Sequence, residues 1–166
     1  MNLPQREGLP HEMPLWVRPE DEIYFLTICC QIRRQNQLCH KPVAAAIFET
    51  VAHRHERGLW HAHLFLLMPD HVHALISCPT DEKDIQSLIF QWKEWTAKQI
   101  GIGWQRDFFE HRLRREESIQ EKSEYIRQNP VRAGLVQNAV DWSFLWIPNP
   151  QGQAGPHARN KRAQQA

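Results

Sequence analysis

The sequence predicts one α+β domain built on an antiparallel sheet of the ferredoxin-like, or split βαβ, type, with helices on one face of the sheet and an extra C-terminal helix. Short apolar runs and amphipathic helical segments follow one another in the order β-α-β-β-α-β, and a further helix comes after them. Two of the apolar runs, residues 59–68 and 71–78, are separated by only Pro69 and Asp70, which is the spacing of a tight hairpin. With 166 residues, of which 42% are hydrophobic, the chain suits a single domain with its own core.

The N-terminal part of the chain predicts an arm, a strand and a helix. Residues 1–20 contain four prolines and little periodicity, which predicts an extended arm. Residues 22–30 read EIYFLTICC; they are β-branched and aromatic and too short for a helix, so we expect a buried strand. The amphipathic helix that follows covers about residues 40–58, with Pro42 near its first turn and Gly58 as its stop signal.

The C-terminal part predicts a helix, a strand and a last helix. Residues 81–99 keep their apolar side chains at helical spacing, and we assign Trp92 and Trp95 of this helix to the core. Residues 104–113 predict a fourth strand, which leaves strand 71–78 at the centre of the sheet. The last helix starts near residue 116 and should end or bend near Pro130.

Composition limits the classes of protein to which the chain can belong. No stretch approaches the roughly 18 to 20 apolar residues of a membrane helix, so we expect no membrane association. The four cysteines include no C-x-x-C pair, which favours a reducing cytoplasm over a disulfide or zinc framework. The formal net charge of +1 is not that of a strongly basic nucleic-acid-binding domain, although basic runs occur locally.

Composition also changes beyond Trp146, where proline, glycine, glutamine and arginine dominate. Such a segment cannot bury enough apolar surface to order itself. We therefore divide the chain into an N-terminal arm (1–20), a main domain (21–147) and a flexible basic tail (148–166).

Two histidines, His71 and His73, stand at the start of the apolar run 71–78. Because side chains alternate faces along a strand, residues i and i+2 point the same way, and the two imidazoles should converge on one point. This arrangement makes the pair a candidate metal site. Ten histidines in 166 residues also produce such spacings by chance, so the pair alone does not decide between a metal site and local hydrogen bonding.

A second pair, His61 and His63, raises the alternative of one four-histidine site. If the hairpin closes at its two-residue turn, His71 lies opposite Met68, and His63 lies about five residues further along its strand, roughly 17 Å away. The two pairs could not then share one ion. We expect His61 and His63 to be structural or surface residues.

The last predicted helix carries a tyrosine and an asparagine at neighbouring positions. Ile119 and Ile126 mark its buried stripe, and Tyr125 stands about 100° from Ile126 at the border of that stripe. Asn129 lies one turn further along the border, because positions i and i+4 are neighbours on a helix. In the alternative interpretation, Tyr125 only packs on the sheet and Asn129 caps the helix before Pro130.

The chain closely resembles the single-tyrosine HUH transposases of the insertion-sequence 200 type, in particular the REP-associated tyrosine transposases. The resemblance rests on the string LMPDHVHALI, followed about fifty residues later by EYIRQNPVRAGLV, with WQRDFFEHRLR between them. It runs from YFLTICC to about DWSF, and it identifies residues 21–147 as an HUH catalytic domain. The family's usual turn before the histidines has Asn where this chain has Asp70, a departure that leaves the proposed ligands in place.

The resemblance implies a role for each residue of the two motifs. His71, His73 and Asn129 would bind a divalent metal, Mg²⁺ or Mn²⁺. Tyr125, on the extra C-terminal helix, would be the nucleophile. The implied activity is cleavage and rejoining of single-stranded DNA at REP-type hairpins, through a 5′-phosphotyrosine and a free 3′-hydroxyl. A monomer is expected, with a homodimer as the alternative.

Single-stranded DNA requires basic groups along its backbone and flat side chains on which bases stack. Trp104 precedes the fourth predicted strand and is our candidate for stacking. The basic side chains that flank the proposed site in sequence are our candidates for DNA binding: Arg112, Arg114, Arg115, Arg127 and Arg132.

Two other functions compete with this interpretation. A histidine-triad nucleotide hydrolase also uses alternating histidines on a strand, but it would need a third histidine where this chain has Leu75, and it has no use for Tyr125. A noncatalytic hairpin-binding module could use the same sheet as RNA-binding domains do. Such a module would not need Asn129 one turn beyond Tyr125.

Overall fold

The computed structural model describes residues 22–78, 84–114 and 118–149. The predicted arm (1–20), almost all of the predicted tail and Arg115 lie outside the described residues.

The described chain forms a five-stranded antiparallel sheet in the order β4-β1-β3-β2-β5. The order of its first four members is consistent with the predicted ferredoxin-like arrangement, and β3 lies at the centre as expected. The strands are β1 (Ile23–Cys29), β2 (His61–Met68), β3 (His71–Ser77), β4 (Phe109–Arg112) and β5 (Leu145–Trp146).

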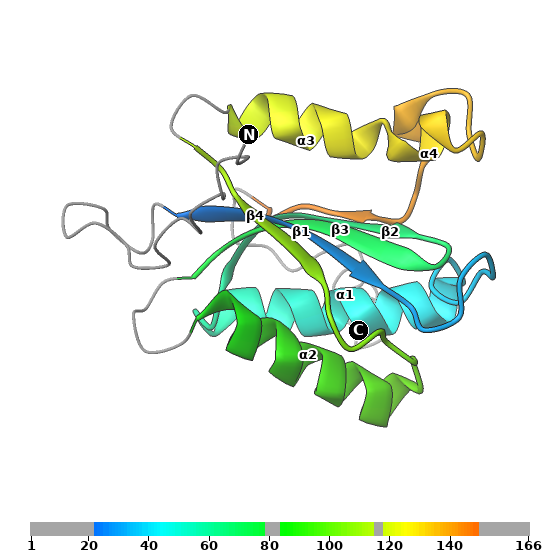
Figure 1. Ribbon diagram of the computed structural model, residues 1–166. Helices are drawn as coiled ribbons and strands as arrows, with labels where there is room; N and C mark the ends of the chain where they lie inside the picture. Colours follow the sequence, from blue (N-terminus) through cyan, green and yellow to red (C-terminus); the bar gives the residue numbers. More distant parts are fainter. Residues whose placement is uncertain (1–21, 79–83, 115–117, 150–166) are drawn as a thin grey trace, which may run out of the picture.

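Helices cover both faces of this sheet (Figure 1). The two crossover helices, α1 (Lys41–Glu56) and α2 (Ile85–Ile100), lie together on one face, as predicted. The extra helical segments, α3 (Ile119–Arg127) and α4 (Asn129–Arg132), lie on the opposite face. No helix among the described residues has both the length and the apolar character needed to traverse a lipid bilayer.

The β2–β3 hairpin fixes which side chains face each helical layer. Met68 pairs with His71 across the two-residue turn, which confirms the predicted register. Val72 and Ala74 therefore join the core beneath α1 and α2, whereas Leu75 joins a second, smaller core beneath α3. Ile126 of α3 is fully buried in that second core.

Several predicted elements differ from the structure. The fourth strand is shorter than residues 104–113, and Trp104 forms only an isolated bridge with Cys30. Trp92 is fully buried as expected, but Trp95 is 45% exposed, so its assignment to the core was wrong. It stands beside a solvent-facing groove between α1 and α2. The short strand β5 and the 3₁₀ helix η2 (Ala139–Asp141) were not predicted.

The last predicted helix is divided in two. α3 ends at Arg127, Gln128 follows, and the single turn of α4 begins at Asn129. Pro130 explains the break, because proline has no N–H to donate to the carbonyl of Ile126. The side-chain amide of Asn129 makes this bond in its place, with 3.1 Å between Nδ2 and the Ile126 oxygen.

Candidate active site

The two histidines of β3 lie side by side on the face of the sheet covered by α3. Their ring centroids are 4.8 Å apart. His73 is 9% exposed and stacks on Phe25 of β1, with 5.7 Å between the ring centroids. Phe25 belongs to the core that Ile126 completes, so the imidazoles and α3 share one side of the sheet.

Each imidazole has its Nδ1 atom occupied by a neighbouring side chain. In His71, Nδ1 lies 2.7 Å from Oδ1 of Asp70. In His73, Nδ1 lies 3.0 Å from Oγ1 of Thr27, its pairing partner in β1. The nitrogen left to face a ligand is therefore Nε2 in both rings.

The surroundings of His73 keep it neutral at ordinary pH. Burial of the ring, with the nearby charges of His71 and Arg132, lowers the pKa of His73 to about 3. A neutral imidazole is the form that binds a metal ion. Arg132, the last residue of α4, is thus close enough to His73 to contribute to its low pKa.

Tyr125 lies at the surface, on the histidine side of the molecule. Its side chain is 53% exposed, so the phenol is not part of the core. Arg132 stacks over its ring with 4.3 Å between Cζ and the ring centroid, and Nζ of Lys122 lies 5.5 Å from the same centroid. Lys122 also lies 5.3 Å from the ring of Phe25, on which His73 stacks. These contacts connect the phenol to the histidine pair.

Asn129 caps the C-terminal end of α3 with the nitrogen of its side-chain amide. Nδ2 donates to the carbonyl of Ile126 and, at 3.5 Å, to that of Tyr125. This is the capping contact of the alternative interpretation. It uses only the nitrogen, so the cap leaves Oδ1 as the atom that could bind a metal.

The candidate ligand atoms are of types that bind divalent ions. Two imidazole nitrogens come from β3, and one amide oxygen comes from α4. Within residues 22–78, 84–114 and 118–149, no group of three or more His, Cys, Asp or Glu side chains is arranged to hold a metal. A metal ion held by the two imidazoles would therefore need amide or solvent oxygens as its further ligands, a combination compatible with Mg²⁺ or Mn²⁺.

The predicted DNA-binding residues are distributed over different parts of the structure. Arg132 lies at the phenol, where its guanidinium also donates to the Tyr125 carbonyl at 2.6 Å. Arg112, on the edge strand β4, forms an ion pair with Glu22, with 3.2 Å between Nε of the arginine and Oε2 of the glutamate. Arg114 lies two residues beyond the end of that strand. The structure therefore brings Arg132, but not Arg112, together with the candidate nucleophile.

Trp104 does not lie with the histidines. Its indole N–H donates to Oγ1 of Thr96 at 2.8 Å, and its ring packs on Trp92 with 5.3 Å between centroids. Both partners belong to α2, on the opposite face of the sheet. These contacts give Trp104 a place in the packing between α2 and the sheet.

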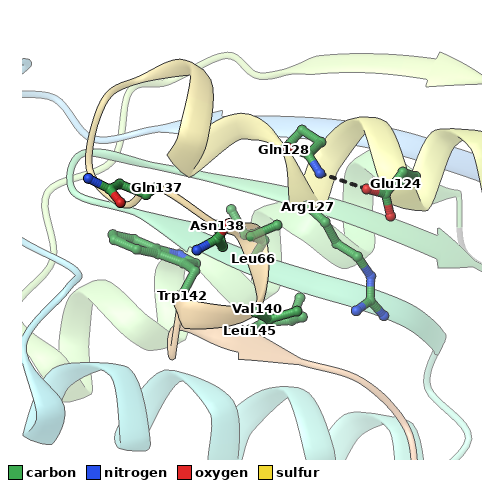
Figure 2. Close-up of a pocket in the computed structure, with 10 residues that line it drawn as sticks. Leu66, Glu124, Arg127, Gln128, Gln137, Asn138, Val140, Trp142 and Leu145 are labelled. Carbon is green, nitrogen blue, oxygen red and sulfur yellow. Dashed lines mark hydrogen bonds between the residues drawn. The ribbon is translucent and has the colours of Figure 1, made fainter.

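Arg127 lines a pocket beside the candidate site (Figure 2). The pocket has a volume of about 510 Å³ and lies between α3 and residues 137–145. Its floor includes Leu66, the pairing partner of His73 in β2. The sequence did not single out Trp142, whose indole N–H donates to the Leu67 carbonyl at 2.9 Å. The only signal for this residue was its place in a run with two further aromatic side chains, Phe144 and Trp146.

Known proteins are similar to this chain in sequence and in fold. No family model matches the chain. The chain is 27% identical over 154 residues to a Haemophilus influenzae protein that carries the name of a REP-associated tyrosine transposase, and the match covers 74% of this chain and 77% of that protein. It is 29% identical over 82 residues to the REP-associated tyrosine transposase of Escherichia coli, a match that spans half of that relative (50%) and 48% of this chain.

The chain is a homologue of the REP-associated tyrosine transposases. A solved structure of such a transposase, bound to a REP hairpin, superposes with a TM-score of 0.66 and 21% sequence identity. The superposition covers 82% of each chain. The shared fold confirms the predicted α+β class with its antiparallel sheet.

Proposed function

We propose that this chain is a metal-dependent single-strand DNA endonuclease and strand transferase, which cleaves at REP-type hairpins through a 5′-phosphotyrosine on Tyr125. The observation that carries the proposal is the position of Tyr125, which lies at the surface and is connected through Lys122 and Phe25 to the histidine pair. Homology to the REP-associated tyrosine transposases supports it, as does the hairpin bound in the structural neighbour.

In this proposal His71 and His73 would hold a divalent ion, Mg²⁺ or Mn²⁺, through Nε2, and Asn129 would be the third ligand through Oδ1. When bound, the ion offsets the negative charge of the phosphodiester, which otherwise repels an attacking oxygen. Capping of α3 by the same asparagine amide ties the third ligand to the helix that carries the nucleophile.

The phenol oxygen of Tyr125 attacks the phosphorus and displaces the 3′-oxygen of the preceding nucleotide. The phenol gives up its proton to solvent, the new phosphotyrosine bond replaces the broken phosphodiester bond, and the departing oxygen takes up a proton as a 3′-hydroxyl. Because one ester replaces another, a second 3′-hydroxyl can reverse the reaction and rejoin the strand. Arg132 and Lys122 flank the phenol and are suited to hold the negatively charged backbone beside it.

The pocket lined by Arg127 offers a path for the DNA strand away from the phenol. It combines the arginine with the amides of Gln128 and Asn138 and the ring of Trp142 (Figure 2). A guanidinium binds phosphate oxygens, whereas amides and an aromatic ring suit unpaired bases. We propose that this pocket, and not Trp104, accommodates single-stranded DNA.

The competing hydrolase has no support in the structure. Leu75, at the position where a histidine triad requires its third histidine, is fully buried in the core beneath α3. A ligand at this position would lie inside the protein.

Covalent capture tests the proposal. We expect a labelled single-stranded REP-type hairpin, incubated with the protein and Mn²⁺, to form a protein–DNA adduct that survives denaturation. Tyr125→Phe should abolish the adduct while hairpin binding persists. Tyr24→Phe is the matched control, because the chain has two tyrosines and Tyr24 lies in β1, packed against the core beneath α1 and α2.

Two results would contradict the proposal. An adduct of undiminished yield in Tyr125→Phe would eliminate the nucleophile. Hairpin binding without any adduct in the unmodified protein, with Mg²⁺ as with Mn²⁺, would establish the noncatalytic binding module instead.

A further inference from the structure

Asp70, in the turn before the histidine pair, is a buried carboxylate with both oxygens engaged. It is 8% exposed. Oδ1 lies 2.7 Å from Nδ1 of His71. Oδ2 accepts the backbone N–H of Arg34 at 2.7 Å and lies 3.3 Å from Nε of Arg33.

The segment that follows β1, residues 30–37, makes further hydrogen bonds to the turn that carries Asp70. The backbone N–H of Cys30 donates to the Asp70 carbonyl at 2.8 Å, and Gln37 donates to the Pro69 carbonyl at the same distance. Arg34 has a φ of +62°, a left-handed conformation that is uncommon outside glycine, and in this conformation its N–H reaches Oδ2. Asp70 is therefore held in place independently of His71.

The contact with Asp70 determines the protonation pattern of the His71 ring. An ionised carboxylate can only accept hydrogen bonds, so Nδ1 of His71 must carry the proton. The lone pair is then on Nε2, directed away from Asp70. The hydroxyl of Thr27 beside His73 has no such effect, because a hydroxyl can either donate to Nδ1 or accept from it.

We propose that Asp70 is a positioning residue that fixes His71 as an Nε2 ligand and strengthens its bond to the divalent ion. The inference rests on the metal site of the proposed function. A carboxylate that accepts the second ring N–H of a ligating histidine fixes the ring orientation and raises the basicity of the ligand. An asparagine at this position has one acceptor oxygen, so it could satisfy His71 or the N–H of Arg34, but not both.

The test measures Mn²⁺ affinity of the full chain, together with the tautomer of His71 in the metal-free protein by ¹⁵N NMR. In the unmodified protein His71 should carry its proton on Nδ1. Asp70→Asn and Asp70→Ala should weaken Mn²⁺ binding about 10- to 100-fold. In Asp70→Ala the proton of His71 should shift towards Nε2. If the alanine variant does not fold, the asparagine variant alone provides the affinity comparison.

Two matched variants separate this role from a purely structural one. Arg33→Gln removes the ion pair with Asp70 but keeps its contact with His71, so Mn²⁺ affinity should remain within about threefold of the unmodified protein. Thr27→Val removes the neutral partner of His73 and should weaken affinity less than Asp70→Asn does. An affinity loss in Arg33→Gln equal to that in Asp70→Asn would show that Asp70 only anchors the loop.

The remaining outcomes distinguish this inference from the proposed function. Unchanged Mn²⁺ affinity in both Asp70 variants, or an unchanged His71 tautomer in Asp70→Ala, would overturn the role of Asp70 and leave the metal site intact. Unchanged affinity in His73→Ala, or no Mn²⁺ binding by the unmodified protein, would overturn the metal site and this inference with it.

Discussion

At the scale of single residues, Arg132 has the closest contact with the candidate nucleophile. Its guanidinium covers the ring of Tyr125 at 4.3 Å and donates to the carbonyl of the same residue at 2.6 Å. It also contributes to the low pKa of His73. Arg132 thus contacts both the ring and the backbone carbonyl of Tyr125, and its charge helps to lower the pKa of His73. A surface arginine that binds DNA only through its charge would make no such contacts.

We expect Arg132→Ala to slow adduct formation by a factor on the order of 10 to 100, because a small misplacement of a reacting group has effects of this size. Arg132→Lys should recover part of the rate, since lysine keeps the charge but not the planar stack. Single-turnover cleavage of a labelled hairpin measures both rates.

Arg57→Ala is the control, because Arg57 is an exposed arginine at the end of α1. Hairpin affinity is measured in parallel. A loss in Arg132→Ala that appears wholly in hairpin affinity, with an unchanged rate at saturating DNA, would show that Arg132 only holds the DNA and does not orient the phenol.

Sequence motifs revealed part of this site and missed the rest. His71 and His73 are two residues apart on one strand, so alternation alone placed their side chains together. Thr27 reaches the site through strand pairing, and Lys122 reaches it from α3, which packs on the sheet; no spacing rule anticipates those contacts. Asp70 is adjacent to His71 in sequence, but the contact of its carboxylate with the ring depends on the conformation of the turn. Trp104 was singled out for its type and its place before a strand, but it packs against α2.

At the scale of elements, α3 depends on a small set of contacts. Ser118 caps its first turn by accepting the N–H groups of Gln120 and Glu121. Ile126 is the fully buried side chain of this helix and joins the core formed by β1, β2 and β3. Because Tyr125 directly precedes Ile126 in the chain, the same contact fixes the height of the phenol above the sheet.

Replacing Ile126 with alanine should therefore lower the free energy of unfolding by about 2 to 5 kcal/mol, the usual cost of removing a buried isoleucine side chain. Denaturant titration followed by circular dichroism measures this change. Leu135→Ala is the control, because Leu135 is 43% exposed and its loss should cost much less. Equal losses in the two variants would show that Ile126 does not anchor α3.

The limits of element prediction have physical causes. Helix α1 and the β2–β3 hairpin carried strong local signals, Pro42 with Gly58 in one case and a two-residue turn in the other, and both formed as expected. The strand β5 has two residues and pairs with Phe65 and Leu66 far away in sequence. So short a strand has no periodicity of its own, and tertiary pairing alone defines it.

At the scale of the whole molecule, the sheet separates two environments. One face carries the larger core beneath α1 and α2, and the other carries the candidate site beneath α3 (Figure 1). The second histidine pair lies at the far end of the hairpin, where His61 pairs with Ser77. The ring centroid of His61 lies 4.5 Å from that of His63 and 4.7 Å from that of His55.

This distal cluster should make stability depend on pH. Burial, with the nearby His61 and His55, lowers the pKa of His63 to about 4, whereas an unfolded histidine has a pKa of about 6.5. Between these values the unfolded chain binds the proton more readily, so the free energy of unfolding should fall as the pH falls from about 6.5 to about 4.

Denaturant midpoints measured across this pH range check the prediction. His63→Gln keeps a polar partner for Ser77, which lies 2.8 Å from the ring of His63, and removes the titrating group. Its stability should vary less with pH than that of the unmodified protein. Parallel pH profiles for the two proteins would exclude His63 as a source of the dependence.

In the proposed function, one divalent ion would lie close to both the histidine pair and the phenol of Tyr125. The chain has two tyrosines, so incorporation of 3-fluorotyrosine gives two ¹⁹F signals, one for each tyrosine. Because paramagnetic broadening falls steeply with distance, added Mn²⁺ should broaden the Tyr125 signal more than the Tyr24 signal, and His73→Ala should remove the difference. Equal broadening of both signals, or stronger broadening of Tyr24, would contradict the claim.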